Sequence, residues 1–233
     1  VRRMRDAYDE YRFHRVYHET VDLATVDLSS IYLDVIKDRL YCESRTGHLR
    51  RSAQTVLHRA AVDMARLLAP VLSFTADEVW HHIPGAADGA ASVFLAGLPE
   101  PVAPDSVDAD LLGEFDTLLE ARSAVTQALE TARNDKIIGK SLEAEIVLEA
   151  PGGEDGWYAV LARNEDLLAD LFIVSAVTLR EAQGAVIRVS VRRSDATRCA
   201  RCWKYTRDVG THDEHPALCA RCASVVIQDA SEG

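Results

Sequence analysis

Four cysteines near the end of the chain have the spacing of a metal site. Cys199-Ala-Arg-Cys202 and Cys219-Ala-Arg-Cys222 are two C-x-x-C pairs, and sixteen residues separate them. Each pair can form a tight turn that points two thiolates at one tetrahedral ion, an arrangement typical of zinc. Four sulfurs fill the coordination sphere and leave no position for water or substrate. We therefore expect one Zn²⁺ ion with a structural role and no chemistry of its own.

Basic and aromatic residues surround the first cysteine pair. Between residues 188 and 207 the chain has seven basic residues and one acid, although its net charge is −11. These cations could offset the negative charge of a zinc-thiolate centre. Alternatively, Arg201 and Trp203 project toward a nucleic acid. The indole would then stack on an unpaired base, and the guanidinium would bond a phosphate or a guanine edge. Spacing alone leaves both interpretations open.

No other group of residues has the spacing of a catalytic centre. Cys42 has no histidine or acid placed to activate it, so we expect it to be a packing residue. Residues 137–141 resemble the end of a phosphate-binding loop, but Asn134 stands where that loop needs glycine. Arg133 and two nearby lysines are expected to suit the negative end of a long helix. Contact with a nucleic-acid backbone is the alternative role for Arg133.

Composition indicates a globular protein in a reducing compartment. The chain has 48% hydrophobic and 27% charged residues, which is ordinary for a soluble domain. No run approaches the roughly 20 apolar residues that span a membrane. Five cysteines, an odd number, argue against a disulfide framework and for the cytoplasm. The chain opens inside a helical pattern without an initiator methionine, so we expect it to be a piece of a longer protein.

The hydrophobic pattern predicts helices over the first 134 residues. Tyr8, Tyr11 and Tyr17 form an aromatic stripe that we expect to lie in the core. The stretch from Asp27 predicts that a second helix starts there, with Asp27 or Ser29 as its cap. The predicted helices are 6–23, 27–40, 52–69, 73–83 and 109–134, with a surface loop over 85–107.

The pattern changes after residue 140. A strand over 142–149, a helix over 157–170 and two β-rich runs predict a small strand–helix–strand–strand unit. The β-rich runs are 173–179 and 185–191. We therefore expect a mainly α protein in three parts. These are a helical bundle over residues 1–140, an α/β junction unit over 141–194, and a four-cysteine zinc-finger module over 195–233 whose tail frays from Gln228.

Five segments of the sequence carry a family resemblance, and they are 27–41, 70–80, 133–143, 199–205 and 219–222. Together they resemble the bacterial isoleucyl-tRNA synthetases, and the resemblance runs from about Met4 to Val226. The helical segments are shared with the valyl and leucyl enzymes of class I, whereas the cysteine module is not. A related finger occurs in formamidopyrimidine-DNA glycosylases, which lack the helices.

The resemblance implies a C-terminal, tRNA-binding region of a ligase used in protein biosynthesis. The bundle would dock on the anticodon stem, and the zinc module would reach the anticodon loop of tRNA(Ile). Arg201 and Trp203 match the family's finger residues that approach the anticodon. With Lys204 and Arg133 they are the candidate RNA-binding residues.

The resemblance does not extend to catalysis. The adenylate-forming signatures His-Ile-Gly-His and Lys-Met-Ser-Lys-Ser do not occur in the sequence. We expect ATP binding, isoleucine activation and editing in upstream domains of the same polypeptide, so this chain has no catalytic site of its own. The alternative is a purely structural zinc clasp with little RNA contact. A DNA-binding finger is disfavoured, because no helix-two-turn-helix pattern accompanies the cysteines.

Overall fold

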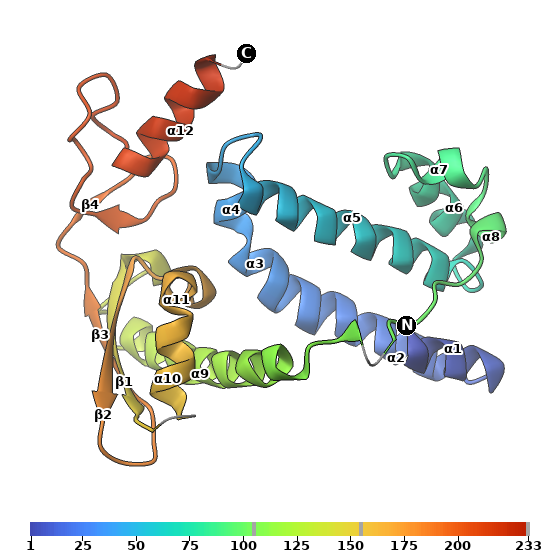
Figure 1. Cartoon of the computed structure of the whole chain (residues 1–233), viewed down its shortest axis with the longest axis horizontal. Helices are drawn as coiled ribbons and strands as arrows, with labels where there is room; N and C mark the ends of the chain where they lie inside the picture. The colour runs from blue at the N-terminus through green and yellow to red at the C-terminus, as the bar shows by residue number, and fades with distance from the viewer. Residues whose placement is uncertain (104–105, 154–155, 232–233) are drawn as a thin grey trace. The chain divides into compact units, whose positions relative to one another are not determined.

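The computed structural model describes residues 1–103, 106–153 and 156–231, which form two compact units (Figure 1). The first unit comprises Val1–Leu40 and Arg45–Val107, and the second comprises Tyr41–Ser44 and Asp108–Gly233. The long helix that we grouped with the preceding helices lies in the second unit. The four residues Tyr41–Ser44 also belong to the second unit, although they lie early in the sequence.

The first unit is built from helices. The helix α5 is the longest of its described helices, and α6 and α8 pack against it. The helical segments are α1 (Arg2–Asp9), α2 (Phe13–Asp22), the π-helical η1 (Leu23–Tyr32), α3 (Leu33–Val35), α4 (Lys37–Cys42), α5 (His48–Leu68), α6 (Ser73–His82), α7 (Ala86–Gly89) and α8 (Val93–Ala96). The last two are single turns within the segment that we expected to be a loop.

The start of the chain differs from the prediction. The helix expected over 6–23 breaks after α1, where Tyr11 takes a left-handed backbone with φ of 56°. The chain is then helical from Phe13 to Val35 and does not restart at Asp27, because the wider π turns of η1 carry it through. The break disperses the aromatic stripe. Tyr8 donates to the Leu67 carbonyl at 2.7 Å. Tyr11 and Tyr17 are exposed, so the prediction that they lie in the core was wrong.

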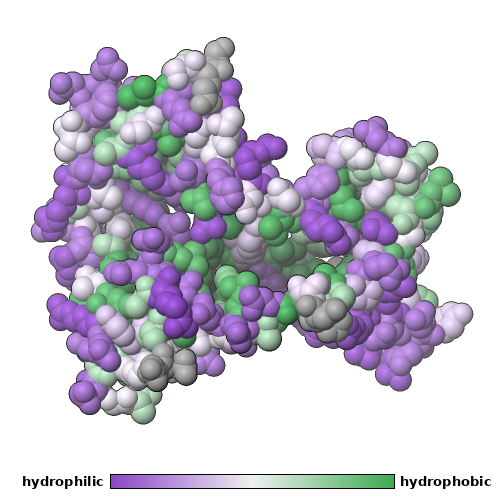
Figure 2. Space-filling model, viewed as in Figure 1, coloured by the Kyte–Doolittle hydropathy of each residue, from purple (hydrophilic) through white to green (hydrophobic). Residues whose placement is uncertain are grey.

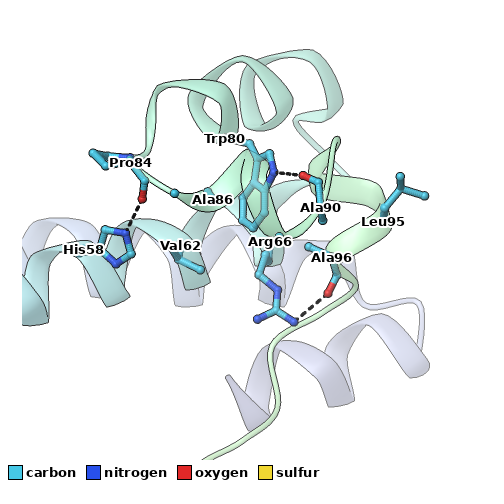
Figure 3. A pocket seen from close by; sticks show the side chains of 11 residues that line it. His58, Val62, Arg66, Trp80, Pro84, Ala86, Ala90, Leu95 and Ala96 are labelled. Carbon is cyan, nitrogen blue, oxygen red and sulfur yellow. Dashed lines mark hydrogen bonds between the residues drawn. The ribbon is translucent and has the colours of Figure 1, made fainter.

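Trp80 is the largest side chain in the main core of the first unit. It is 4% exposed and packs among alanines of α5, α6 and α7. Its indole N–H donates to the Ala90 carbonyl at 2.8 Å. A cavity of about 590 Å³ opens beside it (Figure 3). At its rim His58 bonds the Pro84 carbonyl at 3.0 Å, and Arg66 donates to the Ala96 carbonyl at 2.9 Å. These polar groups fix the 84–98 segment over α5.

Asp77 ties α6 to α8. Its carboxylate accepts hydrogen bonds from the Ser92 hydroxyl at 2.7 Å and from the Val93 amide at 3.0 Å. The bond from Ser92, followed by that from Val93, lowers the pKa of Asp77. The carboxylate therefore acts as a cap for the short helix α8 from outside that helix.

The second unit combines a long helix, a three-stranded sheet and the cysteine module. The sheet has the order β2-β1-β3, with β1 parallel to β2 and antiparallel to β3. This confirms a mainly helical chain that ends in a small sheet and a cysteine cluster. The elements are α9 (Ala109–Asn134), a 3₁₀ turn (Ser141–Glu143), β1 (Ala144–Pro151), α10 (Trp157–Arg163), α11 (Glu165–Phe172), β2 (Ala176–Ala182), β3 (Arg188–Arg193), β4 (Thr197–Arg198), β5 (Tyr205–Thr206) and α12 (Ala220–Ser231).

Alternation along β1 places the core of this unit on one face of the sheet. Ala144, Ile146 and Leu148 are at most 1% exposed, and the residues between them are half-buried. The helices α9, α10 and α11 pack against the sheet (Figure 1). The strand β1 is central and apolar on one face, which fits its period-two pattern.

The chain remains helical close to its end. We expected a frayed tail from Gln228, but α12 continues through Ser231, and residues 232–233 lie outside the described part. Among the described residues, no helix is both long and apolar enough to cross a membrane. Hydrophilic residues cover most of the face seen in Figure 2.

Candidate metal centre

A short β-ribbon carries the first cysteine pair. The strands β4 and β5 pair antiparallel, with Arg198 opposite Tyr205. Within the turn between them, the Cys199 amide donates to the Lys204 carbonyl at 2.9 Å, and the Trp203 amide donates to the Cys199 carbonyl at 3.0 Å. These bonds close the chain into a tight knuckle in which both thiols lie on the inner side.

The start of α12 carries the second pair. The Ala220 amide donates to a carboxylate oxygen of Asp208 at 2.9 Å, which satisfies one of the free amides at the helix start. The Ala200 amide bonds the Ala217 carbonyl at 3.0 Å, and the Cys219 amide donates to the Cys199 sulfur at 3.3 Å. The two knuckles therefore meet through their backbones as well as through their thiols.

The four thiols have the geometry that a tetrahedral zinc ion requires. Cys199, Cys202, Cys219 and Cys222 are each at most 8% exposed, and their sulfurs lie within 4.8 Å of one another. The Cys202 and Cys219 sulfurs are 3.9 Å apart. Zinc–sulfur bonds of about 2.3 Å at tetrahedral angles would set sulfurs about 3.8 Å apart. This group, here called the cysteine cluster, therefore fits Zn²⁺ by donor type and by spacing.

The thiols differ in their acidity. Burial would raise the pKa of Cys199, but hydrogen bonds from the backbone of Cys219, Cys202 and Arg201 overcome this effect and lower it to about 6. Burial raises the pKa of Cys219 to about 11 and also raises the pKa of Cys202. Because metal ligands must be deprotonated, a bound cation would displace protons from the latter two thiols.

Trp203 is the most exposed of the candidate RNA-binding residues around the cluster. It follows Cys202 directly, takes a left-handed backbone with φ of 65°, and is 56% exposed. The guanidinium of Arg198 lies 5.4 Å from the centre of its ring, within the range of a cation–π contact. A flat apolar ring is thus presented to solvent on a rigid knuckle beside a cation.

The other candidates bond within the protein. Arg201 donates to the Cys42 carbonyl at 2.6 Å. Lys204 forms an ion pair of 2.5 Å with Asp170 of α11. Arg133 bonds the Ser141 hydroxyl at 2.6 Å and also pairs with a glutamate one turn earlier on α9. The fold therefore presents Trp203 to solvent, whereas it turns these three cations toward partners of their own.

Much of the positive charge in the stretch 188–207 is paired with carboxylates in the folded protein. Three further arginines of this stretch form ion pairs. Two of their acidic partners lie on or beside β1, and the third lies within the stretch itself. The pairs are Arg192 with Glu145, Arg193 with Glu143, and Arg207 with Asp195. The local excess of positive charge is therefore partly cancelled by the fold.

One contributor to the site was missed from the sequence. Residues 41–44 pack with the cysteine module, and Cys42, which is 6% exposed, joins the buried group formed by the four thiols. Cys42 is thus a packing residue, as predicted, but its neighbours are the cluster cysteines. The sequence held one signal for this contact, the arginine at the third position of each knuckle. These two side chains, Arg201 and Arg221, both bond residues of the 41–44 segment.

Comparison with known protein families gives two matches. Residues 1–148 match the model of the anticodon-binding domain of tRNA ligase. Residues 198–225 match the model of the zinc finger found in FPG and IleRS, and this range includes the whole cysteine cluster. The two matches together cover the first unit, the start of the second, and the metal centre.

Curated proteins named isoleucine–tRNA ligase are similar to this chain. The protein from Symbiobacterium thermophilum is 42% identical over 240 residues, covering 97% of this chain and 25% of the relative. The protein from Syntrophotalea carbinolica is 44% identical over 96% of this chain and 24% of the relative. That from Geobacillus thermodenitrificans is 42% identical over 99% of this chain and 26% of the relative. The chain spans about a quarter of the length of these relatives.

Proposed function

The chain belongs to the family of anticodon-binding domains of tRNA ligases, and we propose that it is the tRNA-binding C-terminal region of an isoleucine–tRNA ligase. In this role it binds the anticodon stem-loop of tRNA(Ile) in the cytoplasm. Activation of isoleucine with ATP, transfer to tRNA and editing belong to domains outside this sequence. The proposal is supported by the identity shared with isoleucine–tRNA ligases along nearly the whole chain.

One observation carries the RNA-binding role. The half-exposed indole of Trp203 is fixed on a knuckle of a buried four-thiol centre, and Arg198 stands beside it. Aromatic side chains and nearby cations bind splayed, single-stranded bases by stacking and by charge. A loop base stacks on the open part of the Trp203 ring, while the guanidinium of Arg198 lies close enough to meet a neighbouring phosphate.

The remaining contacts are to the nucleic-acid backbone. Arg133, Arg201 and Lys204 bind phosphate or sugar in this proposal, and they exchange part of their internal bonds to do so. Such contacts position the tRNA without reading its sequence. Binding at this end then holds the acceptor end over a distant active site, so that binding energy contributes to aminoacylation in the complete ligase.

In this proposal Cys199, Cys202, Cys219 and Cys222 would hold one zinc ion, and the ion would stabilise the knuckles. It would supply no reaction chemistry, because four sulfurs would complete its coordination. The four side chains would then fix the turn from which Trp203 projects. The guanidinium of Arg201, which lies 3.9 Å from the Cys222 sulfur, would offset part of the thiolate charge.

A second candidate function is favoured by the inward direction of two cations in and beside the first knuckle. In this alternative the module is a structural clasp with little RNA contact, because Arg201 bonds the Cys42 carbonyl and Lys204 bonds Asp170. The clasp predicts that chelation unfolds the module and that changes at Trp203 leave tRNA affinity unchanged. The two candidates therefore differ in the consequence of altering one exposed ring.

Binding measurements test the proposal. The chain is titrated with tRNA(Ile), with a tRNA for another amino acid, and with duplex DNA at one salt concentration, alongside elemental analysis for zinc. We expect tighter binding of tRNA(Ile) than of the other two. Equal affinity for all three would overturn the proposal. In the complete ligase, Trp203→Ala is expected to impair charging of tRNA and to leave isoleucine activation intact.

A further inference from the structure

The two knuckles share the sequence Cys-Ala-Arg-Cys, and their arginines reach consecutive residues of one short segment. Arg201, in the first knuckle, bonds Cys42. Arg221, in the second, bonds Glu43 at 2.8 Å. The two arginines are twenty positions apart in the sequence, so only the joining of the knuckles brings them to the same segment. We refer to residues 42–44 as the latch segment.

The contact at Cys42 is reciprocal. Arg201 donates from its guanidinium to the Cys42 carbonyl at 2.6 Å, and the Cys42 thiol approaches the Arg201 carbonyl at 3.7 Å. The same guanidinium nitrogen lies 3.9 Å from the Cys222 sulfur. Arg201 therefore stands between the cysteine cluster and the latch segment, with a donor group close to each.

The other two latch residues are also held by the module. Glu43 pairs with Arg221 in a partly buried ion pair. Ser44, which is 5% exposed, donates from its hydroxyl to the Asp229 carboxylate of α12 at 2.9 Å. Three consecutive residues thus bond the first knuckle, the second knuckle and the helix that follows it.

We propose that packing of the latch segment against the module depends on zinc: the segment binds the module only when the metal holds both knuckles together. This inference rests on the proposed zinc binding at the cysteine cluster. Arg201 lies 3.9 Å from the Cys222 sulfur and bonds the Cys42 carbonyl, and Arg221 bonds Glu43, so both arginines keep these partners only while the two knuckles stay joined. Without the metal the knuckles separate, because structural zinc sites fold with their metal. The paired donors for Cys42 and Glu43 then disperse together.

The latch gives Arg201 a positioning role that is distinct from RNA contact. It lies one residue before Cys202 and two before Trp203, in a turn closed by backbone bonds. Fixing its side chain on Cys42 therefore fixes the turn from which the indole projects. The role can be measured without RNA and without the activity of a complete ligase.

The reactivity of Cys42 and the exchange of backbone amides report the state of the latch. The protein is treated with iodoacetamide, with and without prior chelation of zinc, and Cys42 modification is followed by peptide mass spectrometry. Hydrogen exchange of residues 41–44 is measured in parallel. We expect zinc to slow both processes at least about tenfold, because each requires the latch to open.

Three variants separate the latch from the metal site. Arg201→Ala is expected to retain zinc by elemental analysis, yet to lose the protection of Cys42 about tenfold. Arg221→Ala should speed exchange around Glu43 and serves if the first variant fails to retain zinc. Arg207→Ala is the matched control, because Arg207 is exposed and pairs with Asp195 in the same module. It should leave Cys42 protection unchanged.

Each outcome has a distinct meaning. A protein that carries zinc but shows equal Cys42 reactivity before and after chelation overturns the latch and leaves the proposed metal site standing. Full protection of Cys42 and Glu43 in zinc-loaded Arg201→Ala and Arg221→Ala overturns the role of the arginines. A freshly purified, well-folded protein without zinc, and unable to take it up, overturns the metal site and the latch together.

Discussion

Replacing Trp203 by alanine is the sharpest test of the proposed RNA contact. The side chain is 56% exposed, so its removal leaves little cavity in the fold. Tryptophan and alanine are similarly disfavoured at a φ of 65°, so backbone strain does not separate the two proteins. A change in tRNA affinity would therefore report the lost ring and not a lost fold.

The expected loss follows from the stacking of one base. Base–aromatic stacking contributes about 1–3 kcal/mol per base, so Trp203→Ala should weaken binding of tRNA(Ile) by about 5- to 150-fold. Because the ring is uncharged, the slope of affinity against salt concentration should not change. Arg198→Ala should instead reduce that slope by about 0.7 if the guanidinium meets one phosphate. Trp203→Phe keeps an aromatic face and should retain most of the affinity.

Two readouts make the assay specific. Anisotropy of labelled tRNA(Ile) gives the dissociation constant at several salt concentrations. Tryptophan emission reports the contact when the unaltered protein is compared with Trp203→Phe, because Trp80 is 4% exposed and the partly exposed Trp157 is common to both proteins. Binding should quench part of the emission of the unaltered protein, and Trp203→Phe should lose that part while still binding. An affinity for Trp203→Ala within twofold of the unaltered protein would refute the stacking role and favour the structural clasp.

The remaining predictions concern the metal and the fold. Burial raises the pKa values of Cys202 and Cys219, so zinc uptake should release at least their two protons. The logarithm of zinc affinity should therefore rise by about 2 or more per pH unit near neutrality, and a competition titration at several pH values checks this. The hydrogen bond from Ser92 lowers the pKa of Asp77, so the stability it contributes is present above about pH 4 and is lost as the pH falls through the lowered pKa. Asp77→Asn should therefore remove part of the acid dependence of thermal unfolding, and an unaltered acid limb would contradict it. Leu148 is fully buried in the central strand, so Leu148→Ala should lower the free energy of unfolding by about 2–5 kcal/mol in urea titrations; a loss below about 1 kcal/mol would count against this core.

Local patterns were sufficient for the elements that depend on local physics. The alternation over 142–149 predicted β1, and the apolar spacing over 109–134 predicted α9 with the same bounds. Each reports which face of one element avoids water, and this information is contained in neighbouring residues. The prediction for the start of the chain was wrong, because its deviations from a regular helix leave little trace in the local pattern. The left-handed backbone at Tyr11 and the π turns of η1 have no strong signature in residue type.

Local patterns were not sufficient for the charges around the site. Seven basic residues within 188–207 suggested a positive surface, yet Arg192, Arg193 and Lys204 pair with Glu145, Glu143 and Asp170. Each acid lies more than thirty positions away in the sequence. The local balance of charge in a sequence segment therefore overstates the field that a ligand meets, because the fold brings distant acids to its cations.

The sequence by itself identified the family and the four cysteines of the candidate metal centre. Two C-x-x-C pairs were enough for this, because each knuckle is closed by residues adjacent in the chain. The tertiary structure decided which side chains around the cysteine cluster face solvent and which bond within the protein. It left the Trp203 ring exposed and turned Arg201 and Arg221 inward onto Cys42 and Glu43. The direction of a side chain depends on partners that the chain brings back from more than a hundred residues away, and no local pattern encodes that return.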